Sequence, residues 1–159
     1  MERTLIILKP DALDRGLVGR ILTRFEDKAL QLLALKLDRI PPEQARRHYA
    51  VHAEKPFFPQ LVEYVTSGPV LLAVLAGPGA IGVVRKLLGA TFGSEAEAGT
   101  IRGDFALSRT CNLVHASDSP ESAAREIELF FRPGELHSWS PAYRRAAFLP
   151  GEEGYPEGE

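Results

Sequence analysis

Short apolar runs alternate with amphipathic segments along most of this 159-residue chain, and this alternation is the strongest constraint on its fold. Strands are predicted at residues 4–8, 31–40, 70–76 and 112–115, where apolar residues are bounded by proline, glycine or polar residues. In the second strand, alternation is expected to place Leu33, Leu35 and Leu37 on one face. Helices are predicted at residues 18–30, 41–51, 57–66, 80–88 and 120–131, the last one capped by Ser119.

Without the shorter helices, these elements follow the order β-α-β-β-α-β, which is typical of the ferredoxin-like α+β fold. We therefore expect a four-stranded antiparallel sheet with helices packed on one face, and with the first and last strands side by side at its centre. Residues 90–111 are expected to form a long loop of the kind that is usually functional. The chain length favours one domain at residues 1–149, followed by an acidic Pro/Gly/Glu-rich tail at 150–159.

Composition excludes several classes of protein. Hydrophobic residues make up 45% and charged residues 25% of the chain, which excludes disordered and collagen-like chains. No apolar run approaches the roughly 20 residues of a membrane span. No secretory signal is visible, and the single cysteine, Cys111, excludes a disulfide framework, so a cytoplasmic location is expected. The net charge of -2 becomes +2 without the four glutamates of residues 150–159, which is too weak for a general nucleic-acid footprint.

Two motifs suggest other functions that their context does not support. Residues 77–82 match G-x-G-x-x-G between a predicted strand and a predicted helix, as in a dinucleotide-dependent oxidoreductase. The acidic residue that this motif needs about 20 positions later would be Glu97, which lies in no predicted strand, so a plain turn is favoured. His48 and His52 are four positions apart and could face one metal ion, but no third ligand is apparent, so we expect two surface histidines.

A histidine at a strand end carries the strongest chemical signal in the sequence. His115 comes shortly before the helix start at Ser119, and exposed N–H groups at such a start favour anions. Neutral imidazole can attack phosphorus, because its pKa lies near neutral pH. Glu126, eleven residues later, could accept a hydrogen bond from the other ring nitrogen and fix the tautomer. The spacing alone leaves open a purely structural histidine at a strand end.

Three cations are predicted near the ends of other elements. Lys9 closes the first strand, Arg85 lies on the helix after the third strand, and Arg102 lies in the long loop. If the first and last strands pair, Lys9 and His115 are neighbours. One lysine and two arginines around a nucleophilic histidine suit phosphoryl transfer. Taken singly, each cation is better explained as an ordinary surface residue.

The chain resembles the nucleoside diphosphate kinases over residues 2–131, which is most of its length. Several motifs in register carry this resemblance and make it more specific than any single one. They lie at 2–11 (ERTLIILKPD), 15–19 (RGLVG), 48–49 (HY), 55–58 (KPFF), 67–70 (SGPV), 99–105 (GTIRGDF) and 117–123 (SDSPESA).

This resemblance implies the ferredoxin-like fold and an enzyme that transfers the γ-phosphate of ATP to a nucleoside diphosphate through a phosphohistidine at His115. It implies nucleotide-binding roles for Lys9, Phe57, Arg85, Thr91, Arg102 and Asn112, and supporting roles for Tyr49, Ser117 and Glu126. It implies Mg²⁺ on the nucleotide phosphates without a direct protein ligand, with Asp118 reaching the ion through water. The expected partners are nucleoside di- and triphosphates and further copies of the chain, in a hexamer or tetramer; neither a membrane nor a specific nucleic acid is expected.

The chain departs from the family pattern at several places. Ala116 replaces the glycine of the usual His-Gly-Ser-Asp, which could tighten the pocket or alter the local backbone. The loop at 91–94 (TFGS) keeps only the threonine of the usual Thr-Asn-Pro-Ala, and the segment from about Gly134 is unlike the family's C-terminus. These differences leave a second hypothesis open, a catalytically silenced nucleotide-binding regulatory module on the same fold.

Overall fold

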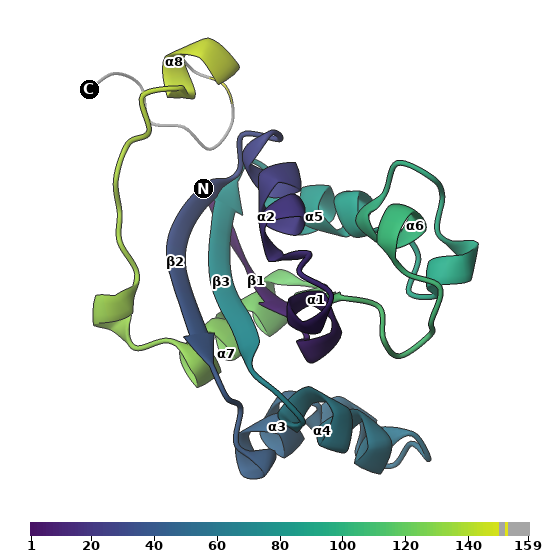
Figure 1. The fold of residues 1–159 in the computed structure, drawn as a ribbon. Helices are drawn as coiled ribbons and strands as arrows, with labels where there is room; N and C mark the ends of the chain where they lie inside the picture. Colours follow the sequence, from purple (N-terminus) through teal and green to yellow (C-terminus); the bar gives the residue numbers. More distant parts are fainter. Residues whose placement is uncertain (150–151, 153–159) are drawn as a thin grey trace.

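The computed structural model describes residues 1–149 and 152, and its elements follow the predicted order (Figure 1). The strands are β1 Glu2–Leu8, β2 Gln31–Asp38, β3 Val70–Gly77 and β4 Val114–Ala116. The helices are α1 Pro10–Asp14, α2 Val18–Glu26, α3 Pro42–His48, α4 Phe58–Thr66, α5 Ala80–Leu88, α6 Ile101–Phe105, α7 Pro120–Phe130 and α8 Arg144–Ala147. Short 3-10 turns lie at Ala50–His52, Gly93–Glu95 and Pro133–Glu135. The acidic tail predicted at 150–159 lies outside the described residues, apart from Glu152.

The four strands form one antiparallel sheet in the order β2-β3-β1-β4. This order confirms the ferredoxin-like prediction and the pairing of the first and last strands. The prediction that both lie at the centre was wrong, because β4 is an edge strand and β3 and β1 are the central pair. Ile7 of β1 pairs with His115 of β4, so the two side chains leave the sheet on the same face.

Helices cover both faces of the sheet, and the prediction of a single covered face was wrong (Figure 1). Ile6 and Leu8 of β1 belong to a core shared with α2 and α5. Leu5 and Ile7 belong to a second core shared with α3, α4 and α7. Both alternating sets of β1 side chains are therefore buried, which explains why its sequence is a continuous apolar run.

The predicted alternation of β2 is interrupted by a bulge between Leu32 and Ala34. The extra residue changes which side chains face the core, so Leu33 is buried while Leu35 and Leu37 are 46% and 67% exposed. Single-residue alternation in the sequence does not reveal such a shift of register. The first half of this edge strand is covered by the segment after α7, because the backbone N–H of His137 donates to the carbonyl of Leu33 at 2.8 Å.

Two further predicted boundaries differ from the structure. Helix α2 ends at Glu26 instead of residue 30, because Ala29 has a φ of 59° in the turn that leads to β2. The predicted loop at 90–111 contains the 3-10 turn Gly93–Glu95 and helix α6. A Cβ at Gly103 would lie 1.9 Å from the carbonyl oxygen of Glu97, so glycine allows α6 to pack closely and to direct Arg102 towards β4.

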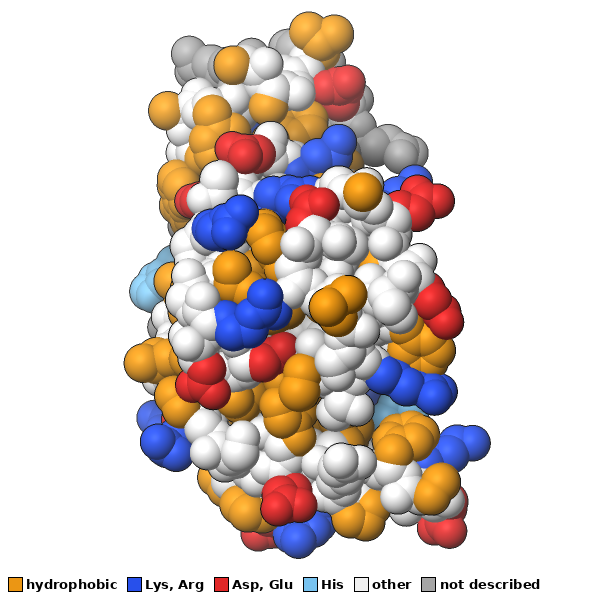
Figure 2. Space-filling model, turned by 45° about the vertical axis from the view of Figure 1, so that its right-hand side comes forward, with side chains coloured by type: hydrophobic (Ala, Val, Ile, Leu, Met, Phe, Trp, Pro, Cys, Tyr) orange, Lys and Arg blue, Asp and Glu red, His pale blue; other side chains and the backbone are white. Residues whose placement is uncertain are grey.

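The surface mixes charges of both signs. On the face drawn in Figure 2, Lys and Arg side chains are interspersed with Asp and Glu side chains over the whole height of the molecule. No helix within residues 1–149 is long and apolar enough to cross a lipid bilayer.

Candidate active site

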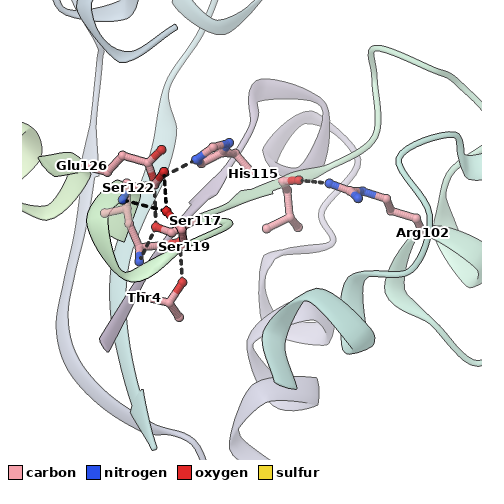
Figure 3. A network of polar contacts seen from close by, with 9 residues as sticks. Thr4, Arg102, His115, Ser117, Ser119, Ser122 and Glu126 are labelled. Carbon is pink, nitrogen blue, oxygen red and sulfur yellow. Dashed lines mark hydrogen bonds and ion pairs between the residues drawn. The ribbon is translucent and has the colours of Figure 1, made fainter. Parts of the chain in front are cut away.

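The imidazole of His115 is held from behind by helix α7. Its Nε2 lies 3.1 Å from Oε2 of Glu126, a carboxylate that is 4% exposed (Figure 3). Glu126 reaches this position because Ser119 caps α7, accepting a hydrogen bond from the backbone N–H of Ser122, and Pro120 occupies the first turn. Since the carboxylate accepts the Nε2 proton, the lone pair of the neutral ring lies on Nδ1.

Ser117 joins this arrangement to the central strand. Its hydroxyl donates to Oε2 of Glu126 at 2.7 Å and accepts a hydrogen bond from the backbone N–H of Leu5 at 3.1 Å. The backbone N–H of Ser117 donates to the carbonyl of Leu5 at 3.1 Å. The carboxylate oxygen that faces His115 is therefore also held by Ser117, which is itself anchored to β1 through Leu5.

The other neighbours of the His115 ring come from the end of α3. The ring of His48 meets it edge to face with centroids 4.5 Å apart, and that of Tyr49 lies at 6.1 Å. Both ring nitrogens of His48 and the hydroxyl of Tyr49 are buried, and none has a hydrogen-bond partner in the described part of the chain. Burial and the nearby His115 lower the pKa of His48 to about 2, so this ring is neutral. The prediction that His48 is a surface histidine was therefore wrong.

A cavity of about 1080 Å³ opens in front of His115. Most of the predicted site residues line it, although they lie far apart in the sequence. They are Lys9, Tyr49, Phe57, Arg85, Thr91, Arg102, Asn112, His115 and Asp118. Of the predicted residues, Ser117 and Glu126 stand outside the lining, because they lie behind the ring of His115.

Lys9 lies at the end of β1, where the pairing with β4 brings it beside the last strand as predicted. Its Nζ donates to Oδ1 of Asn112 at 2.6 Å, and Nδ2 of Asn112 donates to the carbonyl of Thr91 at 2.8 Å. Burial and the positive charge of Arg102 lower the pKa of Lys9 to about 8. Lys9 therefore begins to lose its positive charge only slightly above neutral pH.

Arg102 links three backbone segments around the site. Its guanidinium donates to the carbonyls of Asn112 at 3.2 Å, Gly89 at 3.1 Å and Val114 at 2.6 Å. Two of its five N–H groups remain for a ligand. Burial and the charge of Arg85 lower its pKa to about 10, which still leaves the group cationic at neutral pH.

The backbone between Asn112 and β4 is strained. Leu113 has a φ of 74°, which is unfavourable for a leucine, and its side chain is fully buried. Its carbonyl accepts a hydrogen bond from the N–H of Lys9 at 2.8 Å, and its N–H donates to Oδ2 of Asp11 at 3.2 Å. The N-terminal segment therefore holds the bend that places Asn112 and His115 on the same cavity.

The open side of the cavity carries groups suited to a flat ring and to anions. Phe57, just before α4, is 47% exposed. Arg85 of α5 is exposed and lines the cavity. A hydrogen bond from Ser122 lowers the pKa of Asp118, so this exposed carboxylate is ionised. Asp118 and Glu95 are the carboxylates of the lining, too few for an all-protein Mg²⁺ site but suited to an ion held largely by a phosphate ligand.

Sequence reasoning missed several residues of the cavity. His52, Gln60, Phe92 and Arg109 line it, and the guanidinium of Arg109 lies 4.1 Å from the ring centroid of Phe92. Gln60 lies on α4 and the other three lie on irregular or 3-10 segments, and no periodic pattern marks any of them as site residues. The glycine motif at 77–82 forms the turn between β3 and α5, with Gly79 at a φ of 57°, as the simpler interpretation predicted.

Comparisons with known proteins agree with the geometry. The family model described as "Nucleoside diphosphate kinase" matches residues 2–136. The nucleoside diphosphate kinase of Thermoplasma acidophilum is 54% identical over 87% of this chain and 94% of its own length. That of Thermus thermophilus is 58% identical over 86% of this chain and 99% of its own length. The structure of a halophilic nucleoside diphosphate kinase from Halobacterium salinarum in complex with CDP has a TM-score of 0.91 and 44% identity, over 93% of this chain and 99% of that one.

Proposed function

This chain belongs to the nucleoside diphosphate kinase family, and we propose that it works by a ping-pong mechanism in which His115 carries the phosphoryl group. It is an enzyme, a phosphotransferase that acts on nucleotides. The observation that carries the proposed role of His115 is its position, with Nε2 on the buried Glu126 and the ring at a cavity lined by cations. The silenced-module alternative is not favoured by these comparisons.

In the first half-reaction, Nδ1 of His115 attacks the γ-phosphorus of ATP, the N–P bond forms, and the bond to the bridging oxygen breaks, so that ADP leaves. Glu126 accepts the Nε2–H throughout and stabilises the positive charge that develops on the ring. Ser117 keeps the carboxylate in place. In the second half-reaction, a terminal oxygen of a nucleoside diphosphate attacks the phosphorus, and His115 is released unchanged.

The cations of the cavity bind the phosphates in this proposal. Arg85 and the two unused N–H groups of Arg102 hold non-bridging oxygens, and Thr91 adds a hydroxyl. Lys9 and Asn112 contact the sugar hydroxyls and the phosphates. Holding the reactants in line is expected to supply on the order of 7–11 kcal/mol of the barrier reduction.

The base stacks on Phe57 in the same proposal. A half-exposed aromatic face accepts any base, because every base has a π-face. The relative from Halobacterium salinarum is described in complex with CDP, which supports a nucleotide in the corresponding cavity. We expect broad specificity for the base.

Mg²⁺ is proposed as the metal that accompanies the nucleotide. When bound, it neutralises charge on the phosphates. Asp118 is ionised and borders the cavity, and we propose that it holds a water molecule of the ion.

Assembly and location complete the proposal. We propose a homo-oligomer, hexameric or tetrameric, and the exposed Leu35 and Leu37 on the edge strand β2 support such a contact. A cytoplasmic location is proposed because Cys111 is a free, exposed thiol.

The test is labelling of the protein with ATP that carries a label on its γ-phosphate, in the presence of Mg²⁺, followed by a chase with unlabelled GDP. Wild type should acquire an acid-labile label that the GDP removes as labelled GTP, and His115→Ala should acquire none. His137→Gln, which removes an exposed histidine beside β2, is the matched control and should be labelled normally. Label that persists in His115→Ala would show that another residue is the nucleophile.

A further inference from the structure

A buried histidine, His48, lies next to His115 and has no role in the phosphoryl transfer proposed above. His48 is 4% exposed, and its two ring nitrogens are buried without a hydrogen-bond partner among the described residues. An unpaired buried polar group costs about 1–3 kcal/mol. An electrophile that takes the lone pair of one of these nitrogens would recover part of that cost.

Two further donor atoms converge on the same point. Nε2 of His115 lies 3.1 Å from Oε2 of Glu126, and one ligand atom from each of the three residues lies within 4.8 Å of the other two. Ligands bound about 2.0–2.1 Å from a tetrahedral Zn²⁺ stand about 3.4 Å apart. The His115–Glu126 pair therefore has nearly this spacing already, and the ligand atom of His48 has to approach by up to about 1.4 Å.

The donor set also selects the metal. Two imidazoles and one carboxylate suit Zn²⁺ and similar transition ions, whereas Mg²⁺ prefers oxygen ligands and retains its water. The hydroxyl of Ser117 orients Oε2 of Glu126 from 2.7 Å, as partners behind metal-ligating carboxylates do.

We propose that His48, His115 and Glu126 form a transition-metal site, for Zn²⁺ above all, whose occupation prevents phosphoryl transfer. A neutral imidazole has one proton and one free lone pair. When Zn²⁺ takes the lone pair of Nε2, the proton moves from Nε2 to Nδ1 through solvent, and Nδ1 can no longer attack phosphorus. The site itself is independent of the proposed function, whereas the inhibition rests on it.

Positive groups around the site limit its affinity. Arg125 and Lys9 place positive charge near His48, and this charge opposes the binding of a divalent cation. The carboxylate of Glu126 is the one negative ligand. We therefore expect binding to be reversible and weaker than that of a closed structural zinc site with thiolate ligands.

Calorimetric titration with Zn²⁺, in the absence of nucleotide and Mg²⁺, tests the site. Wild type should bind one ion per chain, and His48→Phe, which keeps an aromatic ring but removes both nitrogens, should bind at least about 10-fold more weakly. His137→Gln should bind as wild type does. Equal affinities for wild type and His48→Phe would overturn the site.

A measurement on the unaltered protein covers the case in which His48→Phe does not fold. With ¹⁵N-labelled histidine, Zn²⁺ should shift the ring-nitrogen NMR signals of His48 and His115. A shift confined to the two histidines outside the cluster, His52 and His137, would contradict the proposal.

Inhibition is tested by labelling after incubation with one equivalent of Zn²⁺. Zn²⁺ should suppress the acid-labile label on His115, and a zinc-selective chelator should restore it. Zinc binding at the three residues with undiminished labelling would overturn the inhibition. Absence of label even without Zn²⁺ would instead be a failure of the proposed function and would leave the binding result standing.

Discussion

The two sides of the His115 ring differ in how completely their polar atoms are paired. On the α7 side, Glu126 contacts both His115 and Ser117, and Ser117 in turn contacts Leu5. On the α3 side, the nitrogens of His48 and the hydroxyl of Tyr49 are buried without partners among residues 1–149. On the α7 side, the polar atoms find their hydrogen-bond partners within the folded chain. On the α3 side, the unpaired atoms remain able to bond or coordinate a ligand.

This difference separates residues that fix the nucleophile from residues that respond to what enters the cavity. Substitutions on the α7 side should change the chemical step and the stability together. Substitutions on the α3–α4 side, which carries Tyr49 and Phe57, should change ligand binding while leaving the free protein nearly unaltered.

The largest effect is expected from Glu126→Gln. A glutamine amide can donate to Nε2 and so favour the tautomer with its proton on Nδ1, which cannot attack phosphorus. The rate of His115 phosphorylation in a single turnover should fall about 100-fold or more. Glu128→Gln, an exposed position on the same helix, should keep the wild-type rate. If the rate in Glu126→Gln fell by less than threefold, the carboxylate on the α7 side would not be what sets the tautomer of His115.

A pair of hydroxyl deletions compares the two sides directly. Ser117→Ala should lower the free energy of unfolding by about 1–3 kcal/mol, because it leaves the N–H of Leu5 without its partner and the buried carboxylate of Glu126 with His115 alone. Tyr49→Phe should change it by less than about 0.5 kcal/mol or raise it, because the deleted hydroxyl has no hydrogen-bond partner among the described residues. Urea denaturation of the nucleotide-free protein measures both values. Equal losses of unfolding free energy in Ser117→Ala and Tyr49→Phe would contradict the difference between the α7 side and the α3 side.

Phe57→Ala should affect binding alone. Loss of the stacking surface should raise the KM for each nucleoside diphosphate about 10-fold. The factor should be similar for adenine, guanine, cytosine and uracil, and the urea midpoint should hardly move because the side chain is 47% exposed. A base-dependent factor would indicate a contact to the base edge.

A pH dependence of stability and of nucleotide binding is expected from Lys9. Its pKa is about 8 in the folded protein against 10.5 for the ordinary group, so the unfolded chain binds this proton more tightly. Between these values the contribution of Lys9 to the free energy of unfolding should rise with pH. Nucleotide binding should weaken over the same range, because the neutral amine no longer attracts phosphate. Lys9→Met should abolish both trends, which KM profiles and urea titrations at pH 7 to 10 would measure.

The sequence predicts the α7 side of the site, with Glu126 and Ser117, better than the α3 side, with His48 and Tyr49. Ser119 and Pro120 mark the start of α7, and Glu126 could be proposed from its spacing as a partner of His115, a contact that the structure confirms. The burial of His48 could not be predicted in this way, because it depends on how the end of α3 packs against β4. The four-residue spacing between His48 and His52 had suggested two histidines on the protein surface. The fold followed from the order of the apolar runs, but the β2 bulge depends on contacts between strands that no local pattern encodes.

The pairing of β1 with β4 also determines when the enzyme can first become active. Leu5 and Ser117, which meet across these strands, are 112 positions apart in the chain. While the protein is being synthesised, β1 leaves the ribosome long before β4, which carries His115, and α7, which carries Glu126. The nucleophile and its carboxylate therefore join β1 only late in synthesis. A chain that ends before α7 therefore lacks Glu126 and should not form the phosphohistidine.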